Sequence, residues 1–294
     1  MNLNLTSFAQ AVRVTDGAWG TQLQALGLSG GACPELWNTE NREAVEAVAR
    51  SYVEAGSDIV LTNTFGANRF VLARHGAGDR AAELAEAGVA ISRQAAGETV
   101  KVFASLGPTG KIVMMEEVPG DEIISTFAQS ARAAAQGGAD AVVLETFNEL
   151  AELSLALRGV KEGCSLPVVC SMTFSSGPDG SATTMGTKPA ELVAAAQAGG
   201  GNAVGANCGI GPDHYVHVVE LLRSAGDLPV WVKANAGLPE LGPGGRTVFP
   251  MGPETFAAHV PALIDAGARF IGGCCGTTPD HIRLVRATVD AVNG

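Results

Sequence analysis

The sequence predicts an α/β protein that folds as a single (β/α)8 TIM barrel. Eight short apolar runs alternate with eight segments of helical pattern along the 294 residues. The runs are rich in Val, Ile and Leu without polar alternation, as in parallel strands that are buried on both faces. Five of the approaches to a run carry a small-residue phrase such as Gly137-Gly138-Ala139, which is typical of a helix C-terminal stop. This count and spacing favour the barrel; a doubly wound open sheet with a small extra domain is the alternative.

The order of elements follows from these runs and stops. Strands are predicted at residues 13–16, 58–63, 100–106, 141–145, 167–173, 203–208, 229–235 and 269–274. Helices are predicted at residues 41–55, 79–96, 121–136, 150–162, 189–198, 213–224, 254–266 and 280–292. No linker, low-complexity tract or shift in composition divides the chain, so we expect residues 1–294 to form one domain.

Composition restricts the compartment and the partners. No apolar run reaches the ~18 residues that span a bilayer, and the N-terminus lacks the basic start and apolar core of a signal peptide. We therefore expect a cytoplasmic protein without a membrane partner. In that compartment the six cysteines are expected to be free or metal-bound rather than paired. The net charge of −11 argues against a nucleic-acid partner.

Three cysteines stand at predicted strand ends. Cys208 ends the sixth run, and Cys274 and Cys275 end and follow the eighth. The ends of barrel strands meet at one rim, and these two strands flank the seventh, so the three thiols could converge. Three thiolates that leave a fourth position open are typical of a catalytic zinc site. For the adjacent pair alone, two buried apolar cysteines or a vicinal disulfide are the alternatives. Cys33, Cys164 and Cys170 lack such strand-end positions and are interpreted as structural.

The strand-end phrases together resemble the homocysteine S-methyltransferase family. This family includes the betaine–homocysteine methyltransferases and the homocysteine-binding domain of cobalamin-dependent methionine synthase. The phrases run from the first strand to the last, at residues 16–21, 62–65, 107–108, 145–146, 205–208, 235–237 and 272–279. The segment 34–38 is closer to the bacterial betaine-type members. The resemblance implies a zinc-containing barrel that transfers a methyl group to the homocysteine thiol and forms methionine.

The resemblance also implies roles for single residues. Asp16 and Glu145 would hold the ammonium group of homocysteine, and the amides of the turn at Gly17 and Ala18 would receive its carboxylate. A turn or helix cap is the alternative for Asp16. A carboxylate at the end of an apolar run, such as Glu145, is harder to explain structurally because unpaired buried charge is costly. Asn235 could occupy the open zinc position before substrate arrives, or could simply bond backbone in its loop.

The methyl donor is expected to be a small onium compound, betaine first, because all 294 residues are used by the eight βα units and leave no cobalamin or folate module. Onium cations favour aromatic walls, and four aromatic residues in or near the rim segments could supply one: Trp19, Trp37, Phe65 and Phe147. S-methylmethionine or a methyl-corrinoid partner protein are the alternative donors, and selenocysteine is an alternative acceptor. A non-catalytic, zinc-stabilised binding subunit of a corrinoid complex is an alternative of another class.

Overall fold

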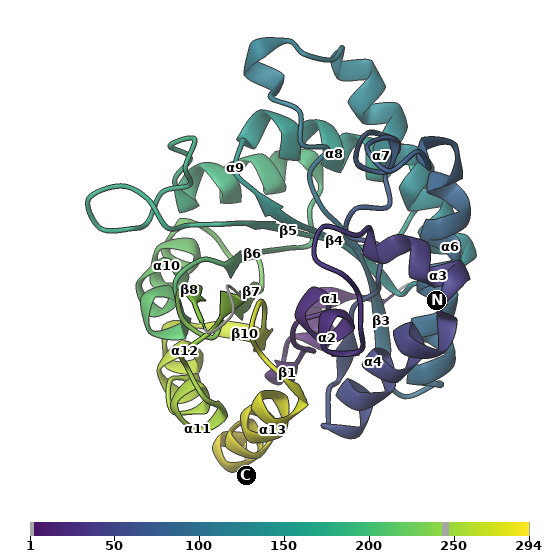
Figure 1. The fold of residues 1–294 in the computed structure, drawn as a ribbon. Coiled ribbons are helices and arrows are strands. Elements are labelled where there is room, and N and C mark those ends of the chain that lie inside the picture. The colour runs from purple at the N-terminus through teal and green to yellow at the C-terminus, as the bar shows by residue number, and fades with distance from the viewer. Residues whose placement is uncertain (1–2, 243–246, 294) are drawn as a thin grey trace.

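Eight parallel strands form the wall of a barrel, and helices surround it (Figure 1). The computed structural model describes residues 3–242 and 247–293. The strands follow one another around the wall in the order β1-β10-β7-β6-β5-β4-β3-β2. Their bounds are β1 (Arg13–Val14), β2 (Ile59–Val60), β3 (Lys101–Leu106), β4 (Ala141–Phe147), β5 (Val168–Met172), β6 (Ala203–Cys208), β7 (Val230–Ala234) and β10 (Ala268–Gly273).

The wall closes between its first two strands. Thr15 pairs with Ile59 in a parallel bridge, and the amide of Asp58 donates to the carbonyl of Val14 at 2.8 Å. A doubly wound open sheet would leave two free edges, so these contacts confirm the predicted (β/α)8 barrel over the alternative.

The outer layer contains the predicted helices, with one of them divided. They are α4 (Arg42–Glu54), α6 (Ala81–Ala96), α7 (Gly120–Gln136), α8 (Leu150–Gly163), α9 (Pro189–Gly199), α10 (Pro212–Ala225), α11 (Pro253–Ala257), α12 (Val260–Ala266) and α13 (Pro279–Asn293). The single helix expected at 254–266 is wrong. Pro261 has no amide hydrogen, and its ring would clash with the carbonyl of Ala257 in a continuous helix, so the chain divides between α11 and α12. Within the described residues, no helix combines the length and apolar character needed to span a bilayer.

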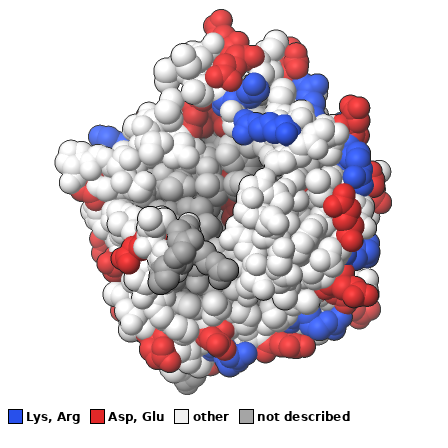
Figure 2. Space-filling model, in the orientation of Figure 1, with Lys and Arg blue, Asp and Glu red and all other residues white. Residues whose placement is uncertain are grey.

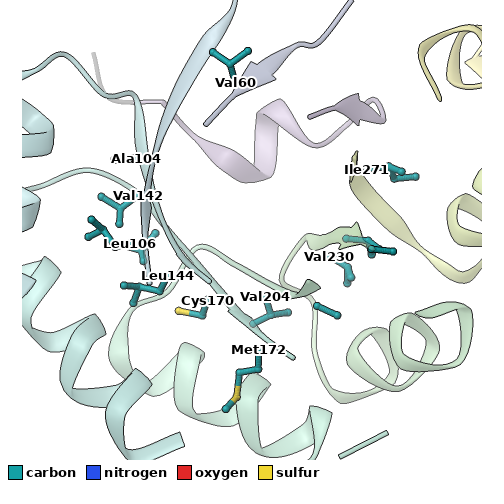
Figure 3. Packing of buried hydrophobic residues seen from close by; sticks show 14 of the residues in the cluster. Val60, Ala104, Leu106, Val142, Leu144, Cys170, Met172, Val204, Val230 and Ile271 are labelled. Atoms are coloured by element: carbon teal, nitrogen blue, oxygen red, sulfur yellow. The ribbon is translucent and has the colours of Figure 1, made fainter. Parts of the chain in front are cut away.

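Side chains of the strands alternate between two apolar clusters, as their pleat requires. Val142 and Leu144 of β4 face the helices (Figure 3), whereas Ala141 and Val143 face the barrel interior. The interior is filled by large rings: Trp231 lies 5.9 Å from Phe103 and 5.7 Å from Phe270, between ring centroids. Leu5 of the short helix α1 (Leu5–Phe8) belongs to the same interior cluster, together with Ala9, which follows the helix. The interior is therefore packed, which leaves the C-terminal ends of the strands for a ligand.

The remaining elements are short and lie mostly in the connections at those ends. They are α2 (Gly20–Ala25), η1 (Pro34–Leu36), α3 (Trp37–Glu40), α5 (Arg69–Ala73), η2 (Gly78–Arg80) and η3 (Val113–Met115). A small antiparallel hairpin, β8 (Glu240–Leu241) and β9 (Thr247–Val248), follows β7 and was not predicted.

Candidate active site

Three thiols meet at the C-terminal end of the barrel. The Sγ atoms of Cys208, Cys274 and Cys275 all lie within 4.8 Å of one another. Cys208 is the last residue of β6, and the other two follow β10, with β7 between these strands. The convergence expected from the sequence is present, and the group could hold a metal ion.

The connection after β7 ties the two cysteine segments together. The amide of Asn235 donates to the carbonyl of Cys208 at 3.0 Å, and that of Ala236 donates to Cys275 at 3.0 Å. The side-chain nitrogen of Asn235 donates to the carbonyl of Gly209 at 2.8 Å, whereas its Oδ1 is buried without a hydrogen-bond partner. A buried acceptor without a donor is costly. An amide oxygen in this condition, on a segment bonded to the cysteine backbone, fits a site built for a cation.

Two residues beside this group adopt left-handed backbone conformations. Cys208 has φ 62° and Thr146, near the end of β4, has φ 66°. Such conformations cost about 1–3 kcal/mol in residues other than glycine and are often found at functional sites. Asn207 stabilises the turn at Thr146, since its Oδ1 accepts from the Thr146 amide at 2.9 Å and its Nδ2 donates to Thr146 Oγ1 at 2.7 Å. The Ser171 hydroxyl also donates to Asn207 Oδ1, at 2.7 Å.

The thiols open into a cavity of about 490 Å³. Figure 2 shows this face of the molecule hollowed near its centre, with mostly uncharged atoms around the hollow. The cavity wall includes the three cysteines, Glu145, and residues of the segment after β1, of η1 and of the loop after β2. This volume lies in the range of small-molecule sites.

Glu145 is 7% exposed and lines the cavity. The hydroxyl of Ser105 donates to its carboxylate. Burial raises the pKa of Glu145 to about 7; the negative charge of Cys274 adds to this effect, and the positive charge of Lys233 opposes it. The residue therefore titrates near neutral pH.

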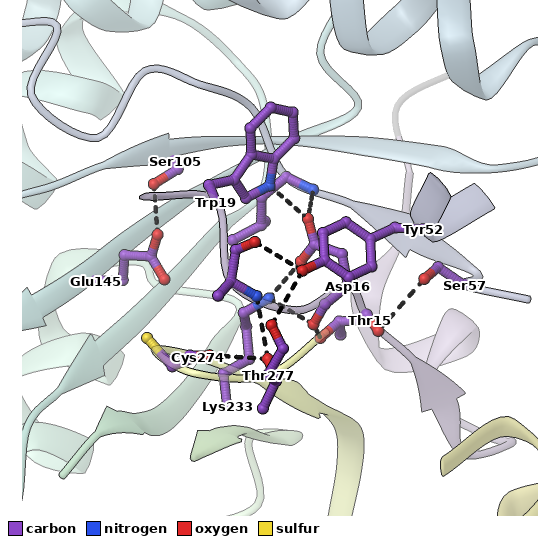
Figure 4. A network of polar contacts seen from close by, with 12 residues as sticks. Thr15, Asp16, Trp19, Tyr52, Ser57, Ser105, Glu145, Lys233, Cys274 and Thr277 are labelled. Carbon is purple, nitrogen blue, oxygen red and sulfur yellow. Dashed lines mark hydrogen bonds and ion pairs between the residues drawn. The ribbon is translucent and has the colours of Figure 1, made fainter. Parts of the chain in front are cut away.

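Asp16 lies deeper than the sequence suggested. Its carboxylate accepts from the indole of Trp19 at 2.8 Å and from the amide of Leu61 at 2.7 Å. It also forms an ion pair with the ammonium of Lys233, a residue only 2% exposed (Figure 4). Asp16 is fully buried and does not line the cavity, whereas Trp19 and Lys233 do. Asp16 therefore contacts Trp19 and Lys233, and its direct contact with an ammonium group stays a prediction.

Sequence comparison identifies the family of this site. The family model described as homocysteine S-methyltransferase matches residues 13–289. The chain belongs to the homocysteine S-methyltransferase family. The resemblance drawn from the strand-end phrases is thus confirmed.

Relatives of this chain include two longer proteins. The methionine synthases of Mycobacterium leprae and Mycobacterium tuberculosis are each 34% identical to it, over 98% and 97% of the chain. The chain spans only 25% of each relative's length. Among solved structures, the metallated form of the homocysteine methyltransferase MmuM from Escherichia coli has a TM-score of 0.78 and 23% identity, and the alignment covers 97% of this chain and 99% of that one. This likeness supports the barrel fold.

Two of the four aromatic residues expected on the cavity wall are elsewhere. Trp19 and Phe65 line the cavity. Phe147 is fully buried against Phe127, with ring centroids 6.0 Å apart. Trp37 packs on the same apolar cluster, which lies between the strands and the surrounding helices. The left-handed turn at Thr146 explains Phe147, because it interrupts the strand alternation and shifts the β4–β5 register between Leu144 and Phe147. These placements correct the prediction for Phe147 and Trp37.

The turn after β1 also differs in detail from the prediction. Gly17 and Ala18 line the cavity, but the amide of Ala18 already donates to Thr277 Oγ1 at 3.1 Å. The hydroxyl of Tyr52 donates to the carbonyl of Ala18 at 2.6 Å. A Cβ atom at Gly17 would stand 2.7 Å from that hydroxyl, so only glycine fits there. The Ala18 amide is therefore engaged with Thr277, and its role with the homocysteine carboxylate stays a prediction.

Sequence reasoning missed several residues of the site. Lys233 lies in the apolar run of β7, where a lysine is unusual because buried charge needs a partner, and that mismatch was the available signal. Asn207 and Thr277 lie within the strand-end phrases 205–208 and 272–279, but their roles were not predicted, since their hydrogen bonds join segments 61 and 259 residues apart. Cys33, interpreted as structural, is buried and also lines the cavity.

Proposed function

We propose that this chain is a zinc-dependent methyltransferase that moves a methyl group from a small onium donor, betaine favoured, to the thiol of homocysteine, giving methionine. The observation that carries the proposal is the meeting of Cys208, Cys274 and Cys275 on the wall of one cavity with Glu145.

Cys208, Cys274 and Cys275 would hold the zinc ion, with Asn235 Oδ1 available as a further oxygen donor. Thiolates are the ligands that zinc favours among soft donors, and three protein ligands leave room for substrate. When bound there, zinc would keep the homocysteine sulfur deprotonated at neutral pH. No general base at the sulfur is then required.

The chain's own residues would orient homocysteine. The Glu145 carboxylate, fixed by Ser105, would accept the ammonium group. The amide of Gly17 on the same wall is the candidate donor to the substrate carboxylate. Asp16 would act through Trp19 and Lys233, whose side chains it holds against the cavity.

Methyl transfer from a quaternary nitrogen requires no reactant besides homocysteine and the donor. The homocysteine sulfur attacks the methyl carbon, a C–S bond forms as the C–N bond breaks, and the electron pair leaves with the nitrogen as a tertiary amine. The positive charge of the donor is lost in this step. The aromatic rings of Trp19 and Phe65 on the cavity wall are suited to hold such a cation before reaction.

A methyl-corrinoid partner protein is the second candidate donor. The relatives are methionine synthases of which this chain spans a quarter. Large apolar side chains are also exposed in connections that follow strand ends: Met114 and Met115 after β3, at 70% and 69% exposure, and Leu241 after β7, at 84%. Exposed apolar groups of this kind are typical of surfaces that bind other macromolecules.

A donor panel separates the two candidates. The purified protein is supplied with zinc and homocysteine, then with betaine, dimethylsulfoniopropionate, S-methylmethionine or methylcobalamin, and methionine is measured. We expect methionine with betaine and little with the corrinoid. Turnover with methylcobalamin alone would reject the onium donor and favour the partner-fed enzyme. Selenocysteine in place of homocysteine tests the acceptor in the same assay.

A further inference from the structure

We infer that the carboxylate of Glu35, together with the ring of Phe65, forms a subsite that recognises the positive charge of the methyl donor. The inference rests on the onium donor of the proposed function and assigns residues to its recognition.

Glu35 is a buried acid whose hydrogen-bond partners are neutral. It is 3% exposed and lines the cavity from η1. Its Oε1 accepts from the amide of Gly66 at 2.6 Å, and its Oε2 accepts from the thiol of Cys33 at 3.1 Å. Neither group cancels the charge of a carboxylate, and burying such a charge without a cation is costly. A cationic ligand in the cavity would relieve that cost.

Among the residues that the structure describes, the cavity wall offers no lysine or arginine that is free to pair with Glu35. Within residues 3–242 and 247–293, Lys233 is the one lysine or arginine on the wall, and its ammonium is paired with Asp16. His75 also lines the cavity and is exposed to solvent. Charges interact more strongly away from bulk water, so the wall near Glu35 is suited to attract a permanent positive charge.

Phe65 lines the same cavity and directly precedes the residue that binds this carboxylate. Gly66, the next residue, donates its amide to Glu35, and a Cβ atom at Gly66 would stand 2.9 Å from Oε1. The Phe65 carbonyl accepts from the amide of Gly107 at 2.8 Å, and its ring lies so close to Gly107 that a Cβ there would collide with it. A fixed anion and a fixed aromatic ring in one cavity are what a quaternary ammonium or sulfonium ligand requires.

Anchoring of the loop after β2 is the competing role for Glu35. The variant Glu35→Gln separates the two roles, because the glutamine oxygen can still accept from Gly66 while the charge is removed. Glu149→Gln is a matched control. Glu149 is 8% exposed and accepts from the amides of Val113 and Met114 at 2.9 and 2.7 Å, but does not line the cavity.

The test compares binding of betaine with that of tert-butylacetate, a ligand of the same shape that lacks the positive charge. Dissociation constants are measured by titration calorimetry with the purified protein in the absence of homocysteine, so that no methyl transfer consumes betaine. We expect the wild type and Glu149→Gln to prefer betaine by at least about tenfold, in line with one charged contact, and Glu35→Gln to bind both ligands alike. Phe65→Leu, a change at a 42% exposed side chain, should lower the preference several-fold.

The outcomes distinguish this subsite from the donor proposal. A Glu35-dependent preference for betaine without methionine formation supports the subsite and rejects betaine as donor. Methionine formation from betaine with an unchanged preference in Glu35→Gln overturns the subsite and leaves the donor proposal standing. A wild type with no preference for the charged ligand also overturns the subsite, whether or not the variants fold.

Discussion

The neighbours of Asp16, Lys233 and Glu145 determine whether each side chain forms an ion pair or titrates. Lys233 and Asp16 are both buried in the barrel and pair with each other. Glu145 has no such cation bonded to it, and burial raises its pKa to about 7. Two acids and one base, from the ends of β1, β4 and β7, therefore divide into a buried ion pair and one carboxyl that titrates near pH 7. We expect the ion pair to shape the cavity and Glu145 to meet a substrate charge.

Removal of Asp16 should destabilise the fold more than it weakens substrate binding. Asp16→Asn leaves the Lys233 ammonium buried without a carboxylate, and breaking a buried pair costs roughly 3–5 kcal/mol. We expect a loss of that size in the free energy of unfolding, measured by urea denaturation, and partial recovery in Asp16→Asn combined with Lys233→Met. A single variant of normal stability with impaired homocysteine binding would instead restore the direct contact predicted from the sequence.

Glu145→Gln should weaken homocysteine binding at pH 8 by about 10- to 100-fold, because a hydrogen bond to a charged group contributes roughly 1.5–3 kcal/mol. The acid accepts an ammonium only when ionised, so wild-type affinity should fall as pH drops through about 7. The variant should lack that step. Calorimetric titration of homocysteine between pH 6 and pH 8.5 measures both effects, and an unchanged affinity at pH 8 would assign Glu145 another role.

Glu145→Gln should stabilise the fold at the same alkaline pH at which it weakens homocysteine binding. The pKa of Glu145 is raised from 4.5 to about 7 in the folded protein. Below pH 4.5 the acid is protonated in both the folded and the unfolded state, and its full contribution to stability is present. As pH rises through 7 the buried carboxyl ionises and that contribution is lost. Above that pH the cost is on the order of 3 kcal/mol. Glu145→Gln should therefore be more stable than the wild type at pH 8 and similar to it near pH 4.5, as measured by urea denaturation.

At the scale of elements, the sequence predicted the regular parts and missed the irregular ones. Apolar runs and glycine stops located the eight barrel strands and most of the helices, since these signals are local. The division between α11 and α12 was foreseeable from Pro261. The left-handed turn at Thr146 was not, because it depends on Asn207 from a strand 61 residues away. That turn decides which β4 side chains reach the cavity, so Glu145 was found and Phe147 was misplaced.

The pairing of β6 with β7 positions Cys208 beside the loop that carries Asn235. Gly205 is in register with Trp231 of β7, and a Cβ atom at Gly205 would overlap the Trp231 carbonyl. Gly205→Ala should therefore push the strands apart and lower the free energy of unfolding by roughly 1–3 kcal/mol, as overpacking does. Gly30→Ala, where no atom lies within 4 Å, is the control. Equal stability of the two variants in urea denaturation would contradict this account.

At the scale of the molecule, closure and filling of the barrel determine where chemistry can occur. The interior rings of Phe103, Trp231 and Phe270 block passage through the barrel, and Leu5 packs on the same cluster. The sequence predicted this architecture and the three converging cysteines, because repeated strand–helix units and strand-end residues are readable without coordinates. It could not predict Glu35 as part of the cavity wall, since that wall is assembled from η1 and the loop after β2 by hydrogen bonds from Gly66 to Glu35 and from Asn63 to the carbonyl of Pro34.

A zinc ion held by Cys208, Cys274 and Cys275 would join the ends of two strands separated in sequence by 66 residues. The barrel closes through β1 and β2 without it, so we expect the metal-free protein to stay folded but to be less stable. At a free zinc concentration 100 times the dissociation constant, binding adds about 2.7 kcal/mol. With roughly 2.1 cal/mol/K of unfolding entropy per residue, a chain of 294 residues should gain about 4 °C in its melting temperature.

Scanning calorimetry with and without zinc, together with metal analysis, measures this gain in melting temperature. Cys208→Ser should abolish it, and Cys164→Ser, a half-buried cysteine outside the cavity, should retain it. Equal zinc content and an equal shift in both variants would exclude the three-cysteine site.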